Sequence, residues 1–98
     1  MLVDVHCHLH FPEFDQDRDA VVERAQKAGV VAIVNSGTEH ASNVQVLELA
    51  KKYDVAKASL GLYPTYIEKI SEEEFQRDLD FIKKNKNKII SIGEVGLD

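Results

Sequence analysis

The chain has 98 residues, of which 44% are hydrophobic and 30% are charged, and its formal net charge at pH 7 is −5. This is the composition of a soluble globular domain, and the acidic balance argues against a broad basic surface for nucleic acid, although a bound cation could still hold a phosphate. One cysteine, no basic-then-apolar leader and no apolar run that could span a membrane predict a reducing, cytoplasmic setting without a membrane partner.

The first predicted element is a β-strand at Leu2–His8, because apolar and polar residues alternate along it. Side chains two positions apart on a strand point the same way. One side of this strand should therefore carry Asp4, His6 and His8, while Cys7 should point toward a helical layer as a small buried hydrophobe. His10 follows in the loop, where we expect a solvated side chain.

Short apolar runs and longer amphipathic runs then alternate along the chain. Gly29 is a typical helix stop, Ser71 and Glu74 form a capping box, and VVAIVN suits a strand that is buried on both faces. The further predicted elements are a helix from an N-cap at Asp15 to near Ala28, a strand at Val30–Asn35, a helix from about His40 to Tyr53, a strand near Val55–Leu60, a helix from Ser71 to about Lys84, and a strand at Ile89–Ile92.

Alternation of strands and helices predicts an α/β fold with a parallel sheet and right-handed crossovers. An open doubly wound sheet and a (β/α)8 barrel both fit, and both gather functional residues at the carboxyl ends of the strands. No glycine-rich nucleotide fingerprint follows the first strand, which weakens the dinucleotide-binding version.

Chemically interesting residues follow each predicted strand. His6 and His8 end the first strand, Asn35 ends the second, Gly61-Leu62-Tyr63-Pro64 follows the third, and Glu94 follows the fourth. Imidazole nitrogen and carboxylate oxygen are ligands that Zn²⁺ and similar divalent metals accept. A carboxylate can also bridge two ions, an arrangement that suits phosphoester hydrolysis.

Three segments together, DVHCHLHFPEFDQDRD, GLYP and IGEVGLD, resemble the N-terminal part of the TatD-family metal-dependent deoxyribonucleases. That family belongs to the amidohydrolase-like metallohydrolases built on TIM barrels. The resemblance covers essentially residues 1–98 and implies about four βα units of a (β/α)8 barrel. It implies hydrolysis of phosphodiester bonds in DNA by a metal-activated water, with His6 and His8 as ligands of one metal and Glu94 as a catalytic ligand bridging two ions of Zn, Mg or Mn.

The chain departs from the family pattern in length and in one loop. The family takes two more histidines and an aspartate from later strands, and such a barrel needs about 250 residues. The chain is therefore expected to be the N-terminal half of a truncated barrel, nearly inactive alone, with the missing half or a second copy as a possible partner. Tyr63 and Thr65 stand where histidines are common, and Tyr63 is a substrate-binding candidate because its hydroxyl can donate to a phosphate.

Several alternatives stay open at this point. The substrate is DNA or a small phosphoester; the competing hypotheses are a related metallohydrolase on another ester or amide and an inactive half-barrel. Asp4 either orients a ligand or is a buried group satisfied by backbone. Asp98 is expected to be a frayed terminus, and KKNKNK an ordinary loop.

Overall fold

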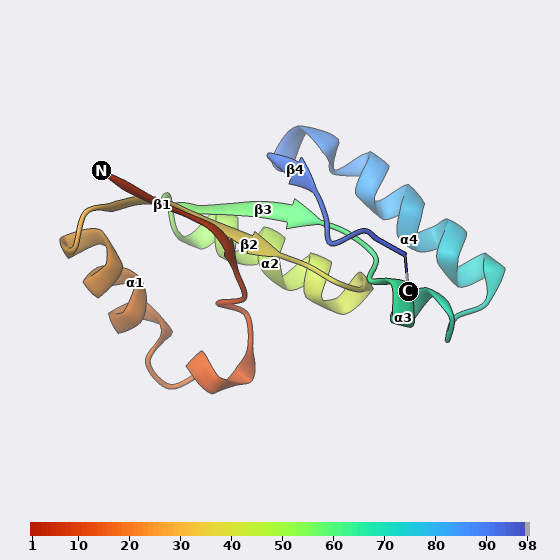
Figure 1. The fold of residues 1–98 in the computed structure, drawn as a ribbon, viewed down its shortest axis with the longest axis horizontal. Coiled ribbons are helices and arrows are strands. Elements are labelled where there is room, and N and C mark those ends of the chain that lie inside the picture. Colours follow the sequence, from red (N-terminus) through yellow and green to blue (C-terminus); the bar gives the residue numbers. More distant parts are fainter. Residues whose placement is uncertain (98) are drawn as a thin grey trace.

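The computed structural model describes residues 1–97 and contains one sheet of four parallel strands in the order β1-β2-β3-β4 (Figure 1). The strands are β1 (Leu2–Cys7), β2 (Val30–Ser36), β3 (Ala56–Leu60) and β4 (Ser91–Ile92). The helices are η1 (Pro12–Phe14, 3-10), α1 (Arg18–Lys27), α2 (His40–Lys52), α3 (Pro64–Ile67), α4 (Glu72–Lys84) and η2 (Lys86–Lys88, 3-10). The predicted α/β class and the parallel sheet are confirmed.

Local details differ from the sequence-based expectations. The first long helix starts at Arg18, because Asp15 closes η1 through its backbone and its carboxylate pairs with the Arg18 guanidinium at 2.7 Å. Asp15 is therefore not the N-cap, and Asp17 occupies that position. Proline at the first helical position explains the unexpected short helix α3. The fourth strand is only two residues long, starting at Ser91 rather than Ile89, and the 3-10 helix η2 occupies the turn before it.

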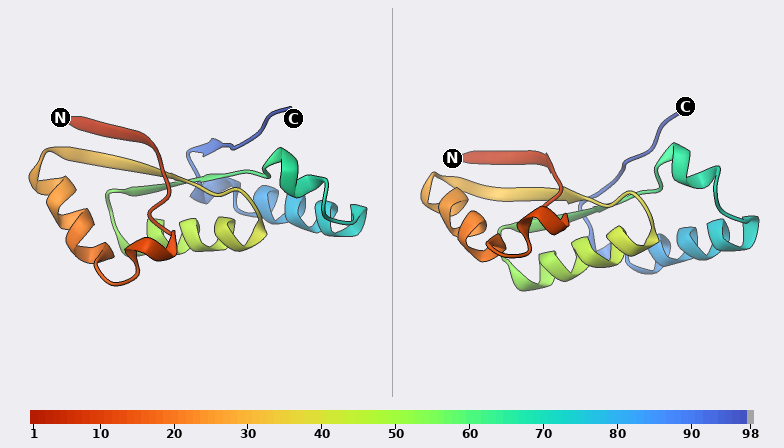
Figure 2. Two further views of the ribbon diagram at one scale, coloured as in Figure 1. Left: turned by 60° about the horizontal axis from the view of Figure 1, so that its bottom comes forward. Right: turned by 90° about the horizontal axis from the view of Figure 1, so that it is seen from below.

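Helices α1, α2 and α4 all lie on one side of the curled sheet (Figure 2). Within residues 1–97 no helix covers the other side of the sheet. Large apolar side chains remain exposed along the strands and their flanks, at Leu2, Val3, Val5, Val31, Ile90 and Ile92. This is the layering of part of a barrel, in which helices pack only on the outside.

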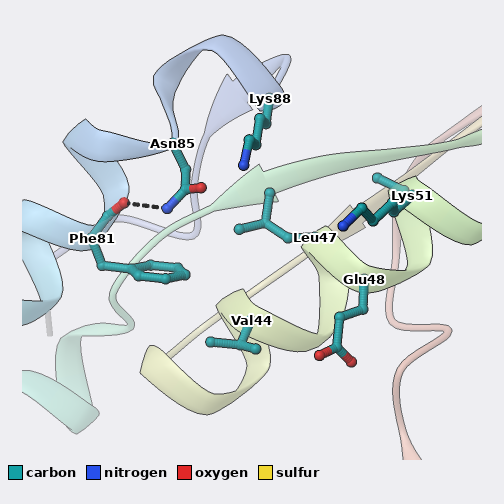
Figure 3. A pocket seen from close by; sticks show the side chains of 8 residues that line it. Val44, Leu47, Glu48, Lys51, Phe81, Asn85 and Lys88 are labelled. Atoms are coloured by element: carbon teal, nitrogen blue, oxygen red, sulfur yellow. Dashed lines mark hydrogen bonds between the residues drawn. The ribbon is translucent and has the colours of Figure 1, made fainter.

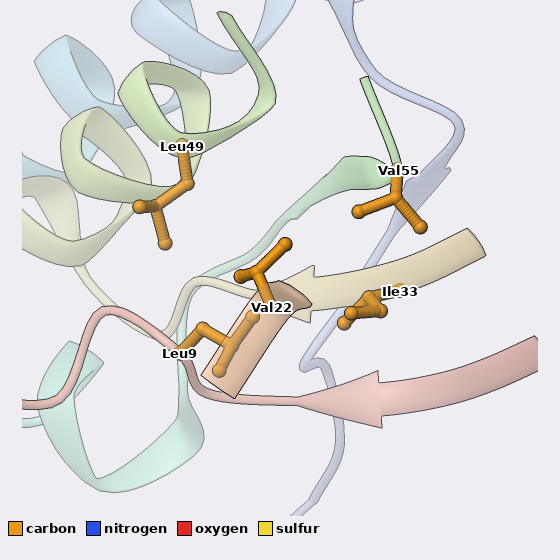
Figure 4. Close-up of a cluster of buried hydrophobic side chains, with 5 residues drawn as sticks. All are labelled: Leu9, Val22, Ile33, Leu49 and Val55. Atoms are coloured by element: carbon orange, nitrogen blue, oxygen red, sulfur yellow. The ribbon is translucent and has the colours of Figure 1, made fainter. Parts of the chain in front are cut away.

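Two apolar clusters fill the space between the sheet and its helices. The first joins the β1 end, α1, β2 and α2 and consists of Leu9, Val22, Ile33, Leu49 and Val55 (Figure 4). The second joins α2, β3 and α4 and consists of Val46, Ala58, Leu60, Leu62 and Ile82. Cys7 packs against the first cluster, as predicted, but it is half-buried rather than buried. Its partial burial together with the nearby Asp4 charge raises the pKa of the thiol.

A buried carboxylate ties the short helix α3 to α4. Asp78 is fully buried and accepts hydrogen bonds from the Tyr66 hydroxyl at 2.6 Å and from the Arg77 guanidinium at 3.2 Å. His40 Nδ1 lies 3.6 Å from the same carboxylate. A buried charge is tolerated only when it is paired and hydrogen-bonded, so this network holds the chain that leaves the β3 loop.

Replacing Tyr66 with phenylalanine is expected to change the response to alkaline pH. Burial, then the hydrogen bond and charge of Asp78, raise the pKa of Tyr66 to about 12. The folded state thus keeps this proton more tightly than the unfolded chain, whose tyrosine titrates near 10. The contribution of the Tyr66 proton to the free energy of unfolding is fully present below about pH 10 and is lost as the pH rises to about 12.

The variant Tyr66→Phe should lose about 1–3 kcal/mol at pH 7, because Asp78 loses a donor, and should show a shallower alkaline decline. Urea unfolding at several values between pH 7 and pH 11.5 measures both effects. Tyr53, whose pKa is also raised, is present in both proteins, so their difference isolates Tyr66. Parallel declines in the two proteins would contradict the assignment.

No helix in the described residues is long and apolar enough to cross a membrane.

Candidate metal centre

His6, His8 and Glu94 converge at the carboxyl ends of the strands. His6 Nε2 lies 3.0 Å from Glu94 Oε1, and His8 Nε2 lies 3.3 Å from the same oxygen. One potential ligand atom from each of these three residues lies within 4.8 Å of the other two. Among residues 1–97, no other group of three or more His, Cys, Asp or Glu side chains meets this criterion. The structure therefore brings together all three metal-ligand candidates that the sequence identified.

The curl of the sheet makes this meeting possible. β1 and β4 are the two outer strands of the sheet, with β2 and β3 between them. Neighbouring strands are about 4.8 Å apart, so a flat sheet would separate the outer strands by roughly three such spacings. Because the sheet curls, the Glu94 side chain, which follows β4, reaches His6 and His8 at the end of β1.

Both imidazoles are anchored through their other ring nitrogen by the same residue. His8 Nδ1 lies 2.9 Å from the backbone carbonyl of Ser36, at the end of β2. A carbonyl only accepts, so Nδ1 donates, which in the neutral ring leaves the Nε2 lone pair available to a metal ion. His6 Nδ1 lies 3.3 Å from the Ser36 hydroxyl. Metal-binding histidines commonly have such an oriented second nitrogen, and two neutral imidazoles with a carboxylate fit a divalent cation well.

Aromatic rings enclose one side of His8. Phe11 stacks on it with ring centroids 4.8 Å apart and planes 6° apart, and the His10 ring meets it edge-on at 5.6 Å. The side chain of His8 is accordingly 24% exposed, against 54% for His6. The structure thus supports His8 from more directions than His6.

The expectation that His10 is solvated is wrong. The residue is only 9% exposed, and its Nδ1 has no hydrogen-bond partner in the described part of the chain. Burial, with smaller effects from nearby His8 and Arg18, lowers the pKa of His10 to about 4. The cause is the turn after β1, in which Arg18 donates to the carbonyls of Leu9 and Phe11 and folds the segment back on the core.

Three other candidates lie outside the His6–His8–Glu94 group. Asp4 is exposed, not buried, and its Oδ1 accepts from the backbone N–H of His6 at 3.1 Å, which favours the orienting alternative. Tyr63 is 43% exposed at the start of α3, and its backbone N–H donates to the Thr38 carbonyl at 2.7 Å. Asn35 is fully buried, and its Oδ1 accepts from Leu9 N–H. Asp98 lies outside the described residues.

Sequence reasoning missed Ser36, which contacts both imidazoles, and Asn43, which is buried in α2 and hydrogen-bonded to Gly61. Ser36 comes directly after Asn35 at a strand end, so its position was an available signal. Asn43 lies in a helix, where an asparagine is normally a neutral surface residue, and no sequence pattern marks its complete burial.

A cavity of about 400 Å³ lies elsewhere, between α2 and α4 (Figure 3). Leu47 and Phe81 form part of its apolar lining, and in this view the Lys88 amine lies above Leu47 and the Lys51 amine beside it. None of the three converging residues lines it, so the candidate chemistry is confined to the strand ends.

Comparison with known proteins gives consistent matches over nearly the whole chain. The family model described as TatD related DNase matches residues 3–98. The uncharacterized metal-dependent hydrolase YjjV of Escherichia coli is 38% identical over 96 residues, covering 98% of this chain and 37% of that protein. Human deoxyribonuclease TATDN3 is 37% identical, covering 99% and 38%, and the 3′-5′ ssDNA/RNA exonuclease TatD of Salmonella typhimurium is 32% identical, covering 99% and 36%.

A solved structure agrees with this result. The crystal structure of YjjV, a TatD homologue, superposes with a TM-score of 0.84 at 37% sequence identity, covering 99% of this chain and 38% of that one. The chain thus spans between 36% and 38% of the length of these relatives. The predicted fold, part of a TIM barrel, is confirmed.

Proposed function

Because this chain belongs to the TatD-related DNase family, we propose that it supplies the metal-binding N-terminal part of a hydrolase that cleaves phosphodiester bonds in DNA. The convergence of two oriented imidazoles and a carboxylate on one point is the observation that supports this proposal most directly. Relatives named as a deoxyribonuclease and an ssDNA/RNA exonuclease support the choice of substrate class.

His6 and His8 would bind the ion through Nε2, and Glu94 through its carboxylate. A bound divalent cation, of the Zn, Mg or Mn type, polarises a phosphoryl oxygen and lowers the pKa of water. The Ser36 contacts hold both rings in place before any ion arrives, which reduces the entropy lost on binding. Glu94 has a second carboxylate oxygen, so it can bridge two ions, and we propose two.

Tyr63 is proposed to contact the substrate phosphate. Its side chain is exposed in the loop that follows β3, and its hydroxyl can donate a hydrogen bond without adding charge. An imidazole in the same position could also carry a proton, whereas a phenol stays neutral at pH 7. Tyr63 therefore also supports a second candidate function, hydrolysis of another ester or of an amide at the same metal centre.

A chimera tests the two functions. This chain replaces the matching 96 residues of E. coli YjjV, and the product is assayed with Mn²⁺ on 5′-labelled single-stranded DNA and on a panel of lactones, amides and small phosphodiesters. We expect DNA cleavage that EDTA abolishes and that His6→Ala lowers to background, while the 98-residue chain alone is almost inactive. Activity confined to lactones or amides would overturn the nuclease proposal.

A further inference from the structure

We propose that Asn43 is a positioning residue for Glu94, acting through the backbone of the β3 loop. Asn43 lies in α2, and its side-chain hydrogen bonds go to Gly61 rather than to His6 or His8. The inference rests on the proposed function, because it concerns Glu94 as a metal ligand. Three sets of contacts connect the two residues.

The Asn43 side chain forms hydrogen bonds with both backbone polar groups of Gly61. Its Nδ2 donates to the Gly61 carbonyl at 3.0 Å, and its Oδ1 accepts from the Gly61 N–H at 3.2 Å. Asn43 is fully buried, and neither bond competes with bulk water. Two bonds to one residue fix its orientation as well as its position, so Gly61 is held firmly where β3 ends.

Gly61 in turn lies directly against the backbone of the ligand loop. A Cβ added at Gly61 would overlap the Gly93 carbonyl group and the Glu94 nitrogen. Gly93 N–H also donates to the Leu60 carbonyl at 2.9 Å. Only glycine permits such an approach. The position of Gly61, which Asn43 holds, therefore determines where the Gly93–Glu94 peptide lies.

A second path reaches Glu94 from the other side of Asn43. A Cβ added at Gly37 would overlap Asn43 Oδ1, so Gly37 packs on the amide. The Gly37 carbonyl accepts from Glu94 N–H at 3.4 Å, and the Gly37 N–H donates to the Ser59 carbonyl at 2.9 Å. Asn43 is therefore the common support of the two backbone segments that flank Glu94.

The proposal is tested with Asn43→Ala in two ways. In metal-free protein, ¹H–¹⁵N NMR should show the Gly93 and Glu94 amide signals displaced and their hydrogen exchange accelerated. In Zn²⁺ titrations by calorimetry, the Kd should rise by about 10–100-fold, as for other partners that orient metal ligands. The control Val22→Ala removes buried apolar contacts in the first cluster, away from the β3 loop, and should lower the Tm while leaving the Glu94 signal and the Zn²⁺ Kd unchanged.

If Asn43→Ala does not fold, Asn43→Ser, whose side chain is too short to reach both Gly61 groups, takes its place. Gly61→Ala tests the next step of the path, the contact between Gly61 and the Gly93–Glu94 peptide, with Asn43 intact. Its added methyl group should displace the Glu94 signal and weaken Zn²⁺ binding. Unchanged Glu94 signals and an unchanged Zn²⁺ Kd in the folded variant would overturn the proposal. Failure of the unmodified protein to bind Zn²⁺ would instead overturn the proposed function, and the metal-free NMR comparison would still decide the role of Asn43.

Discussion

Replacing His8 with alanine is expected to weaken Zn²⁺ binding by more than about 100-fold. Residues that only orient a ligand are worth about 10–100-fold in metal affinity, and His8 would bind the ion directly. Its Nε2 lies 3.3 Å from Glu94 Oε1, and its ring is anchored by Ser36 and stacked on Phe11. Calorimetric titration of EDTA-treated protein with Zn²⁺ measures the change.

His40→Ala is the matched control for this substitution. The chain has four histidines, and His40 lies near Asp78 and Phe81, outside the converging group. We expect the control to bind Zn²⁺ with the affinity of the unmodified protein. Equal losses in both variants would mean that the measured binding is not at the strand ends, and the metal-centre proposal would fail.

The largest effect on stability is expected from Leu60→Ala. Leu60 is fully buried at the end of β3 and belongs to the second apolar cluster, between the sheet and α4. Removing the Cγ methine and both methyl groups there leaves a cavity, and such substitutions cost about 2–5 kcal/mol. Small domains are stable by only about 5–15 kcal/mol, so the urea midpoint should fall strongly with an unchanged m-value.

Leu97→Ala provides the same chemical change at a fully exposed position. Surface substitutions of this kind alter the free energy of unfolding by about 0.5 kcal/mol or less. A loss at Leu60 no larger than the loss at Leu97 would show that the second cluster does not stabilise the fold.

The sheet and the central site residues were predictable because their signals are local. The alternation in Leu2–His8 and the apolar run at 30–35 need no tertiary information to be read as strands. Parallel strands place their carboxyl ends at one edge, so His6, His8 and Glu94 were expected at the same edge, and the family resemblance implied that they bind a common metal. The structure adds the curl that closes the remaining distance.

The features that were missed depend on contacts between distant segments. His10 lies in the loop after the first strand and was expected to be solvated, yet Arg18 folds this loop onto the core. Burial of Asp78 depends on Tyr66, twelve positions away in another helix. Propensity and periodicity describe a residue by its neighbours in the chain, so they cannot reveal partners that only the folded chain supplies.

Ser36 contacts the His6 ring through its side chain and the His8 ring through its backbone. The two contacts therefore differ in how a mutation at position 36 affects them. The contact to His6 depends on a hydroxyl, which any change to alanine removes. The contact to His8 depends on a main-chain oxygen, which every amino acid at position 36 retains. Substitutions at position 36 can therefore change the orientation of the more exposed His6 ring, while the contact that orients the His8 ring is kept.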